Sequence, residues 1–366
     1  MKRLRRAVKD TIIEAGAGLV AAGLDRAPRT PDELVELRPA RVLLVRTDRI
    51  GDLLATTPLV AAFRRLWPEA DIVLLGGRRN RAVAGLMPYV RRAPVEFSRD
   101  PGSWARLTTW VPRQRFDVAV ALRSEVFSGA WLCALSNAPV RVVVNATPAL
   151  PAFNTVLVDS DQHHVRRCWR AAARLSVHWP EPRPIVELPR ESARRAEAAW
   201  RALEIPEHEV AVGIAVPSRS GSRHRQRALP EAALVTLCRL VSAGGMRPVM
   251  FGFGPELVEA RRIAAAVDGV RVAPPLDFAT LGALLARLSV YVSGYSGPLH
   301  LADAVGTATV SVGSPVHVAN FRPLGPGHRA LAAVTVASVP PESIAAEVAE
   351  LAGRSGAGVG KPSVGG

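Results

Sequence analysis

The chain has 366 residues, 48% hydrophobic and 22% charged, which is typical of packed globular proteins with room for two domains. Its formal net charge of +15 comes almost entirely from arginine, a side chain suited to planar contacts with phosphate. Aromatic residues make up only 5% and do not alternate with basic residues, so the sequence does not indicate nucleic-acid binding. Cys133, Cys168 and Cys238 lack metal-ligand spacing, which predicts buried thiols and a cytoplasmic location.

Residues 1–38 form a basic N-terminal segment. Positively charged residues at positions 2–9 precede an apolar stretch, 11–24, which is too short to span a bilayer and contains Glu14. The interruption by Glu14 and the absence of a cleavage site argue against export. Two interpretations stay open for residues 2–24. They form either an amphipathic helix on the inner face of the cytoplasmic membrane or a helix packed on the protein's own body.

From residue 39 onward, short apolar runs alternate with helical periodicity, a pattern that predicts an α/β protein with parallel sheets. In the first half, residues 39–188, the predicted strands are Arg41–Val45, Asp71–Leu75, Phe116–Ala121 and Arg141–Val144, and the predicted helices include Leu53–Leu66 and Phe127–Leu135. The proline-rich stretch Trp179–Pro189 predicts an extended connection between two domains.

The second half, residues 189–351, repeats the alternation. Its predicted strands are Val210–Val216, Pro248–Phe251, Val290–Val292 and Thr307–Val312, and its predicted helices are Arg190–Leu203, Pro230–Ser242, Glu256–Val267 and Ala279–Ala286. Residues 352–366 are rich in glycine and serine and predict a disordered tail.

The loop after the first predicted strand carries polar groups at a position where open parallel sheets bind ligands. It contains Thr47, Asp48, Gly51 and Asp52, and Thr57 follows in the next predicted helix. A carboxylate at this position can act as a general base on a substrate hydroxyl. The plainer interpretation is that Asp52 stabilises the first turn of the helix, as acidic residues often do.

A second loop of this kind follows the predicted strand Val290–Val292. Ser296 and Gly297 form a turn before a helix that starts near Pro298, a residue favoured in a first helical turn. Gly297 allows the backbone to approach a ligand closely, and the free N–H groups of a helix start suit a phosphate.

Together the two loops resemble glycosyltransferase family nine, the ADP-heptose:lipopolysaccharide heptosyltransferases, over roughly residues 40–330. The family's early motif corresponds to Gly51-Asp52 followed by Thr56–Pro58, and its late motif Asp-Thr-Gly-Pro-x-His-Leu-Ala corresponds to Tyr295–Ala302. The resemblance implies the GT-B architecture, in which two Rossmann-like domains face each other across a cleft. It also implies inverting, metal-independent transfer from a nucleotide-diphosphate sugar, foremost an ADP-sugar, with Asp52 as the base.

The resemblance further implies donor-binding residues in the second half. His300 either contacts the diphosphate or orders its loop, and Glu256 either contacts the ribose or stabilises a helix start. The loop 217–230 lacks the lysine of the family, so we expect arginine to replace it; a solvated basic loop is the alternative. The candidates in that loop are Ser218, Ser220, Arg225 and Arg227.

At two places the roles of the family's residues cannot be carried over directly to this chain. Tyr295 stands where the family has an aspartate that contacts the donor sugar, so we expect an altered specificity first and a loss of activity second. His163 and His164 precede a helical cluster of arginines, and we expect a surface or packing role for them.

The expected partners are a nucleotide-sugar donor and a glycan, lipid-linked or small glycoside acceptor. A non-catalytic nucleotide or glycan binder and an epimerase on the same architecture are the alternatives.

Overall fold

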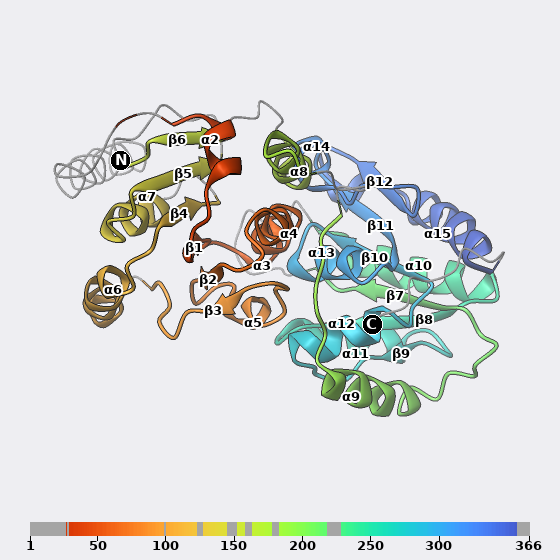
Figure 1. The fold of residues 1–366 in the computed structure, drawn as a ribbon. Coiled ribbons are helices and arrows are strands. Elements are labelled where there is room, and N and C mark those ends of the chain that lie inside the picture. Colours follow the sequence, from red (N-terminus) through yellow and green to blue (C-terminus); the bar gives the residue numbers. More distant parts are fainter. Residues whose placement is uncertain are drawn as a thin grey trace, which may run out of the picture. The chain divides into compact units, whose positions relative to one another are not determined.

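The computed structural model describes residues 27, 29–98, 100–122, 127–144, 152–157, 163–177, 183–217 and 228–356 (Figure 1). The chain divides into two compact units, residues 1–182 and 183–366. The predicted domain boundary after residue 188 falls between this division and the first helix of the second unit. Most of the basic N-terminal segment, including residues 2–24, lies outside the described residues.

The first unit contains a parallel sheet with the strand order β3-β2-β1-β4-β5-β6. Its strands are β1 (Arg41–Val45), β2 (Asp71–Leu75), β3 (Arg91–Arg92), β4 (Val118–Ala121), β5 (Val140–Val144) and β6 (Thr155–Leu157). The strands β1 and β2 have the predicted bounds. Both are buried from their second residue onward, as expected of apolar strands covered on both faces.

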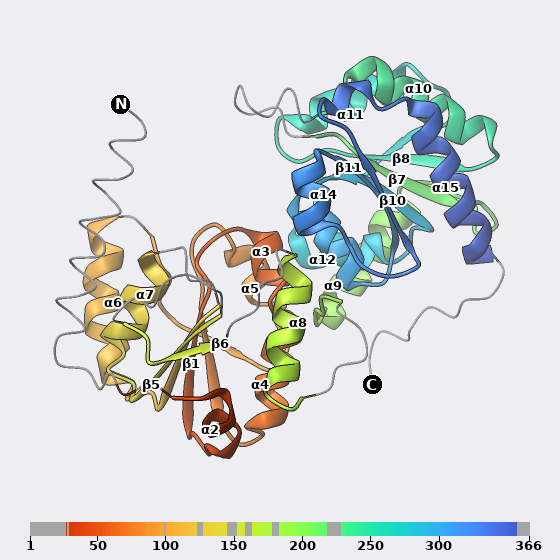
Figure 2. The same cartoon turned by 90° about the horizontal axis from the view of Figure 1, so that it is seen from above.

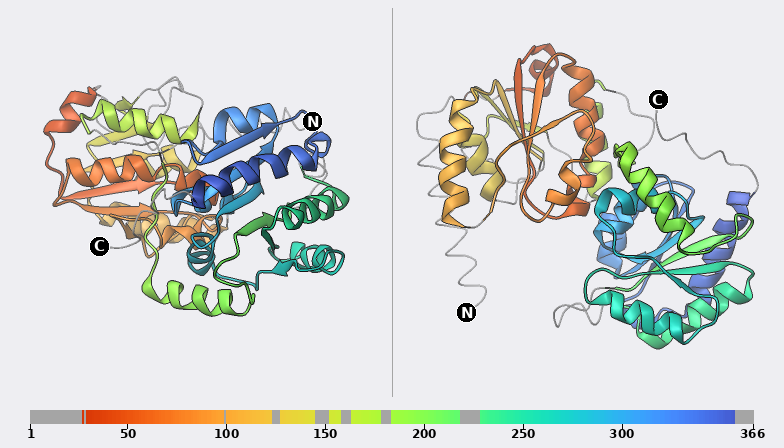
Figure 3. Two further views of the ribbon diagram at one scale, coloured as in Figure 1. Left: turned by 90° about the vertical axis from the view of Figure 1, so that its right-hand side faces the viewer. Right: turned by 90° about the horizontal axis from the view of Figure 1, so that it is seen from below.

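Helices cover both faces of this sheet (Figures 2 and 3). They are α2 (Pro31–Glu36), α3 (Ile50–Leu54), α4 (Thr57–Leu66), α5 (Arg81–Ala84), α6 (Pro101–Arg113), α7 (Phe127–Leu135) and α8 (His164–Arg174). The pair α6 and α7 packs on one face, where apolar residues of β1, β2 and β4 form a buried core with them. On the other face, α4 and α8 pack against each other.

The helix predicted over Leu53–Leu66 is two helices, because the chain breaks at Ala55 and Thr56. The Thr56 and Thr57 hydroxyls donate to backbone carbonyls three residues earlier, at 2.6 and 2.8 Å. Pro58 has no N–H to continue the ladder, and it lies in the first turn of α4, where the missing N–H costs nothing. The break separates α3, which directly follows the loop after β1, from α4.

The second unit contains another parallel sheet, with the order β12-β11-β10-β7-β8-β9. Its strands are β7 (Ala211–Ala215), β8 (Arg247–Phe251), β9 (Arg271–Val272), β10 (Val290–Gly294), β11 (Ala308–Gly313) and β12 (His328–Ala332). Its helices are α9 (Arg190–Arg201), α10 (Glu231–Ala243), α11 (Glu256–Ala265), α12 (Phe278–Leu285), α13 (Gly297–Ala304), α14 (Pro315–Phe321) and α15 (Pro341–Gly356). One face packs against α10, α11 and α15 to form the larger core, and α12 lies on the other face (Figure 2).

The last helix also corrects the predicted start of the C-terminal tail. The sequence predicts disorder from residue 352, whereas α15 continues to Gly356. Leu351 and Ala352 are 2% and 8% exposed and belong to the core of the second unit, which holds this turn in place. Residues 357–366 lie outside the described residues. In the described part of the chain, no helix is both long and apolar enough to cross a membrane.

Both sheets have the strand order of the Rossmann fold, with the first strand of each unit at the centre. Connections from β1 lead to one edge of the sheet and connections from β4 lead to the other, and β7 and β10 are arranged in the same way. At this switch point the loops diverge and leave a crevice at the carboxyl ends of the strands. The fold therefore marks one crevice in each unit, beside β1 and β4 in the first and beside β7 and β10 in the second.

Candidate functional site

In the first unit, the loop after β1 is fixed to its neighbours at the switch point. Its Thr47 hydroxyl lies 2.5 Å from the hydroxyl of Ser128 in α7, which follows β4. Asn80 donates to the Arg46 carbonyl at 2.8 Å and accepts from the Gly77 N–H at 2.9 Å. A Cβ on Gly77 would lie 2.7 Å from the Thr47 carbonyl oxygen, so only glycine allows the loops after β1 and β2 to approach this closely.

Arg46, the first residue after β1, contacts both acidic side chains of the loop and of α3 in this crevice. Its side chain is 5% exposed, and its Nη1 donates to the carbonyl of Leu122 at the end of β4, at 2.6 Å. Its Nε donates to Asp48 Oδ1 at 2.8 Å, and its Nη2 lies 3.6 Å from Asp52 Oδ1. One buried guanidinium thus joins the two central strands and compensates the charge of two carboxylates.

Asp52 is the third residue of α3, and its side chain is 12% exposed. The N-cap position belongs to Arg49, so Asp52 does not cap the helix, although its place in the first turn suits the helix dipole. The imidazole Nδ1 of His164, the first residue of α8, lies 3.4 Å from Asp52 Oδ1. Arg46 and His164 thus hold the Asp52 carboxylate in place in the crevice.

Of the other predicted residues of the first unit, some lie near Asp52 and one lies in the helix behind it. Asp48 is paired with Arg46, and Gly51 is the second residue of α3 beside Asp52. Thr57 is fully buried in α4 with its hydroxyl on a backbone carbonyl. The structure therefore brings Thr47, Asp48 and Gly51 together with Asp52 and places Thr57 in the helix behind them.

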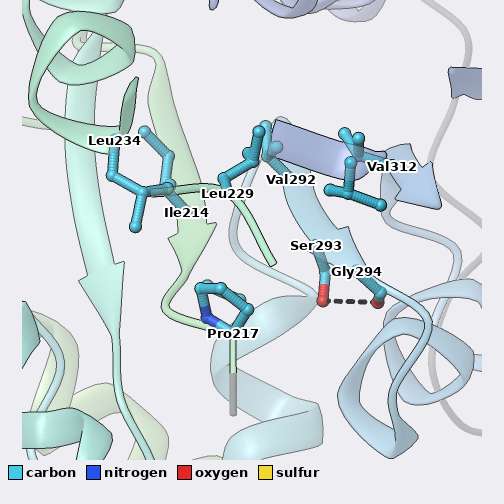
Figure 4. Close-up of a pocket in the computed structure, with 10 residues that line it drawn as sticks. Ile214, Pro217, Leu229, Leu234, Val292, Ser293, Gly294 and Val312 are labelled. Carbon is cyan, nitrogen blue, oxygen red and sulfur yellow. Dashed lines mark hydrogen bonds between the residues drawn. The ribbon is translucent and has the colours of Figure 1, made fainter. Parts of the chain in front are cut away.

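In the second unit, a small apolar pocket lies at the carboxyl ends of β7 and β10 (Figure 4). Most of its lining is aliphatic and comes from β7, β10, β11 and α10 and from segments outside these elements: Ile214, Ala215, Pro217, Leu229, Leu234, Val292, Val312 and Val336. Its polar contribution comes from Ser293, whose hydroxyl donates to the Gly294 carbonyl at 2.9 Å. The predicted serine and arginine loop begins directly after Pro217, and Ser218, Ser220, Arg225 and Arg227 lie outside the described residues.

Tyr295 follows β10 and turns toward β11. Its hydroxyl lies 3.0 Å from the Ser311 hydroxyl, and its ring occupies the space beside Gly313, where a Cβ would lie 2.4 Å from the ring. The ring also lies 5.8 Å from that of His317 in α14. Burial raises the pKa of the Tyr295 phenol, so the hydroxyl stays protonated at neutral pH. Tyr295 is thus a neutral, partly enclosed side chain at this edge.

The remaining predicted residues of the second unit lie at two helix starts. Ser296 is the exposed N-cap residue of α13, and Gly297 is the first residue of that helix. His300 lies in the same helix and is only 5% exposed, so its ring packs inside the unit. Glu256 is half-buried in the first turn of α11, where an acidic residue suits the helix dipole.

The sequence argument missed two residues that shape the crevice of the first unit. Arg46 precedes Gly51-Asp52 of the early motif, and its position directly after a buried strand is a usable signal. The sequence predicts a surface or packing role for His164, whereas the structure places its ring against Asp52. No local pattern could reveal that contact, because it depends on how α8 packs against α4.

These sheets and crevices can now be compared with known proteins. The model of glycosyltransferase family 9 (heptosyltransferase) matches residues 104–340. The chain belongs to glycosyltransferase family 9. This membership identifies the chain as a glycosyltransferase and confirms the predicted family. No curated protein matches the chain.

Solved structures share the fold of the family 9 chain at low sequence identity. The family 9 glycosyltransferase of Veillonella parvula has a TM-score of 0.76 at 15% identity and covers 87% of this chain and 99% of its own. The ADP-heptose lps heptosyltransferase II of E. coli has a TM-score of 0.69 at 17% identity, and the match covers 86% of this chain and 99% of the heptosyltransferase. Heptosyltransferase WaaC of E. coli, solved with ADP, has a TM-score of 0.66 at 18% identity and covers 85% and 99%. The predicted GT-B fold is confirmed.

Proposed function

We propose that this family 9 enzyme transfers a sugar of the heptose class from a nucleotide-diphosphate donor to an acceptor hydroxyl, with inversion and without a metal ion. Asp52 is the general base. The observation that supports this most is the position of Asp52, at the carboxyl end of the central strand and in contact with Arg46 and His164. The acceptor is a hydroxyl of a glycan, a lipid-linked glycan or a small glycoside.

The reaction follows from the chemistry of these groups. The acceptor hydroxyl gives its proton to the Asp52 carboxylate while its oxygen attacks the anomeric carbon of the donor. The bond from that carbon to the diphosphate breaks, and the diphosphate leaves with the bonding electrons. Because attack occurs opposite the leaving group, the configuration at the carbon is inverted. Arg46 keeps the base close to a positive charge within a largely buried crevice.

The donor side of the proposal rests on the second unit. The N–H groups at the start of α13 are suited to a leaving diphosphate, and Ser296, Gly297 and His300 belong to that helix or its cap. WaaC was crystallised with ADP and with ADP-2-deoxy-2-fluoro heptose, which makes an ADP-sugar the first donor to test here. The loop with Ser218 and Arg225 and the first turn with Glu256 complete the proposed donor site.

The experiment is the variant Asp52→Asn, assayed by ADP release from ADP-heptose with a panel of glycan acceptors. We expect the transfer rate to fall by about 100-fold or more, the usual contribution of a general base. Binding of ADP, followed as a rise in thermal midpoint, should persist. The matched control is Asp71→Asn, which removes a carboxylate at the opposite end of the same sheet. Unchanged transfer in Asp52→Asn would refute the assignment of the base.

A second candidate function is nucleotide or glycan binding without transfer. Tyr295 supports it, because this neutral side chain stands where the family motif has an aspartate and is engaged with Ser311. The same assay separates the two functions: a binder shows the ADP-dependent rise in thermal midpoint but no ADP release with any acceptor. The cytoplasmic location and the contact of residues 2–24 with a membrane remain predictions.

A further inference from the structure

Two adjacent histidines at the start of α8 have different surroundings. His163 is the N-cap residue, is 2% exposed, and accepts a hydrogen bond from the Arg166 N–H through its Nδ1 at 3.4 Å. His164 is the first helical residue, and its Nδ1 points to Asp52 Oδ1 at 3.4 Å. Capping of α8 accounts for the histidine at position 163. The formation of the helix does not require an imidazole at position 164.

The contact between His164 and Asp52 is largely shielded from water. The side chains are 17% and 12% exposed, and a small pocket beside them is lined by Arg46, Leu122, His164 and Arg167, among others. The contact joins the start of α8 to the first turn of α3, and α8 is itself held by its packing on α4. An imidazole fixed in this way can restrict the rotation of the carboxylate.

The same carboxylate oxygen has a second cationic neighbour. Arg46 Nη2 lies 3.6 Å from Asp52 Oδ1, but the shorter contact of this guanidinium, 2.8 Å, is with Asp48. Arg46 therefore supplies charge to both acids, whereas the imidazole of His164 contacts Asp52. At 3.4 Å the contact is longer than an ideal hydrogen bond, and such contacts shorten when an active site is filled.

We propose that His164 is a positioning residue for Asp52. Its Nδ1–H donates to Oδ1 and keeps the ionised carboxylate turned toward the acceptor hydroxyl, while the proton of that hydroxyl passes to Asp52 and not to the imidazole. This inference rests on the proposed role of Asp52 as the base. Misplacement of a reacting group by about 1 Å can cost 100-fold in rate, so loss of His164 should lower kcat by about 10- to 100-fold.

The test compares three variants with ADP-heptose and the acceptor that supports transfer. His164→Ala should lower kcat by about 10- to 100-fold and leave the KM for the donor within about twofold. His164→Asn should recover most of the lost rate, because its side-chain amide carries an N–H donor near the position of Nδ1. The matched control His163→Asn keeps a good N-cap residue next to it and should keep the wild-type kcat. Equal kcat in His164→Ala and wild type, or equal loss in His164→Ala and His164→Asn, would overturn the proposal.

A double mutant separates this proposal from the one on which it rests. If the imidazole acts only through the carboxylate, adding His164→Ala to Asp52→Asn should slow transfer no further. Independent losses in the two variants would show that His164 acts in another way. If Asp52→Asn itself transfers at the wild-type rate, the assignment of Asp52 as the base fails, and the role of His164 fails with it. If Asp52→Asn is inactive and His164→Ala is not impaired, only the role of His164 fails.

A readout without turnover is the NMR spectrum of the histidine rings in the full chain. The ring C–H signals of His164, assigned by their loss in His164→Asn, should move when Asp52 is replaced by asparagine and stay in place in Asp71→Asn. Unchanged His164 signals in Asp52→Asn would show that the two side chains do not interact in solution and would overturn the proposal.

Discussion

Replacement of Arg46 by methionine should destabilise the first unit strongly. The guanidinium is 5% exposed and engages Asp48, Asp52 and the Leu122 carbonyl, so Arg46→Met removes a cationic partner from two carboxylates and a donor from one carbonyl in a buried crevice. Removing one partner of a buried ion pair costs about 3–5 kcal/mol. The carboxylates are still 12–13% exposed and regain some hydration, so we expect the lower limit, about 3 kcal/mol.

The measurement is thermal unfolding followed by tryptophan fluorescence. Six of the seven tryptophans lie within residues 1–182, so the signal reports mainly on the first unit. For a unit of this size, about 3 kcal/mol corresponds to a fall in Tm of about 6–12 °C. The double variant Arg46→Met with Asp48→Asn should recover part of that loss, because it removes one of the uncompensated charges.

The control for this prediction is Arg91→Met. Arg91 is paired with Asp71 at 2.8 Å, but its side chain is 50% exposed, so losing the pair should cost at most about 1 kcal/mol. If Arg46→Met costs no more than Arg91→Met, the crevice is hydrated and Arg46 does not stabilise it as argued. If the double variant is less stable than Arg46→Met alone, charge compensation is not the reason for the loss.

Two further predictions concern the second unit. Asp277 accepts from the Thr280 N–H at 2.9 Å as N-cap of α12, and Asp277→Ala should cost about 1 kcal/mol in urea unfolding at pH 7. That hydrogen bond holds the pKa of Asp277 below its usual 3.8. The contribution of Asp277 to the free energy of unfolding is therefore complete above pH 3.8 and is lost as the pH falls through the lowered pKa. A difference in unfolding free energy between wild type and Asp277→Ala that stays constant down to about pH 2 would contradict this. Gly213→Ala would place a Cβ 2.5 Å from Leu288 Cδ1 and should cost about 1–3 kcal/mol in the same assay, whereas Gly353→Ala, with open space around it in α15, should be neutral or stabilising.

The central strands of both sheets could be predicted because each is a short apolar run buried on both faces. Arg41–Val45 and Asp71–Leu75 are the clearest cases. The edge strands lacked this signal: β3 and β9 have two residues each, and β12 is half-exposed and begins with His328. Short edge strands are defined by the neighbour with which they pair rather than by their own sequence.

The candidate site could be predicted only as far as it is local in sequence. Thr47, Asp48, Gly51 and Asp52 lie in one loop and the helix start that follows it, and the order of strand, loop and helix places them at the edge of the sheet. The contacts of Asp52 with His164 and of Thr47 with Ser128 join residues far apart in the chain. Such contacts arise from the packing of α7 and α8, which no motif encodes.

The strand order of the first unit also determines when its charged crevice is completed during synthesis. The ribosome delivers β1 and the loop with Arg46 and Asp52 early. The Leu122 carbonyl that accepts from Arg46 directly follows β4, and His164 comes later still with α8. A nascent chain that ends before α8 therefore carries the carboxylate without its imidazole. The crevice cannot close around Asp52 until almost all of the unit has left the ribosome, so its assembly is a late event in co-translational folding.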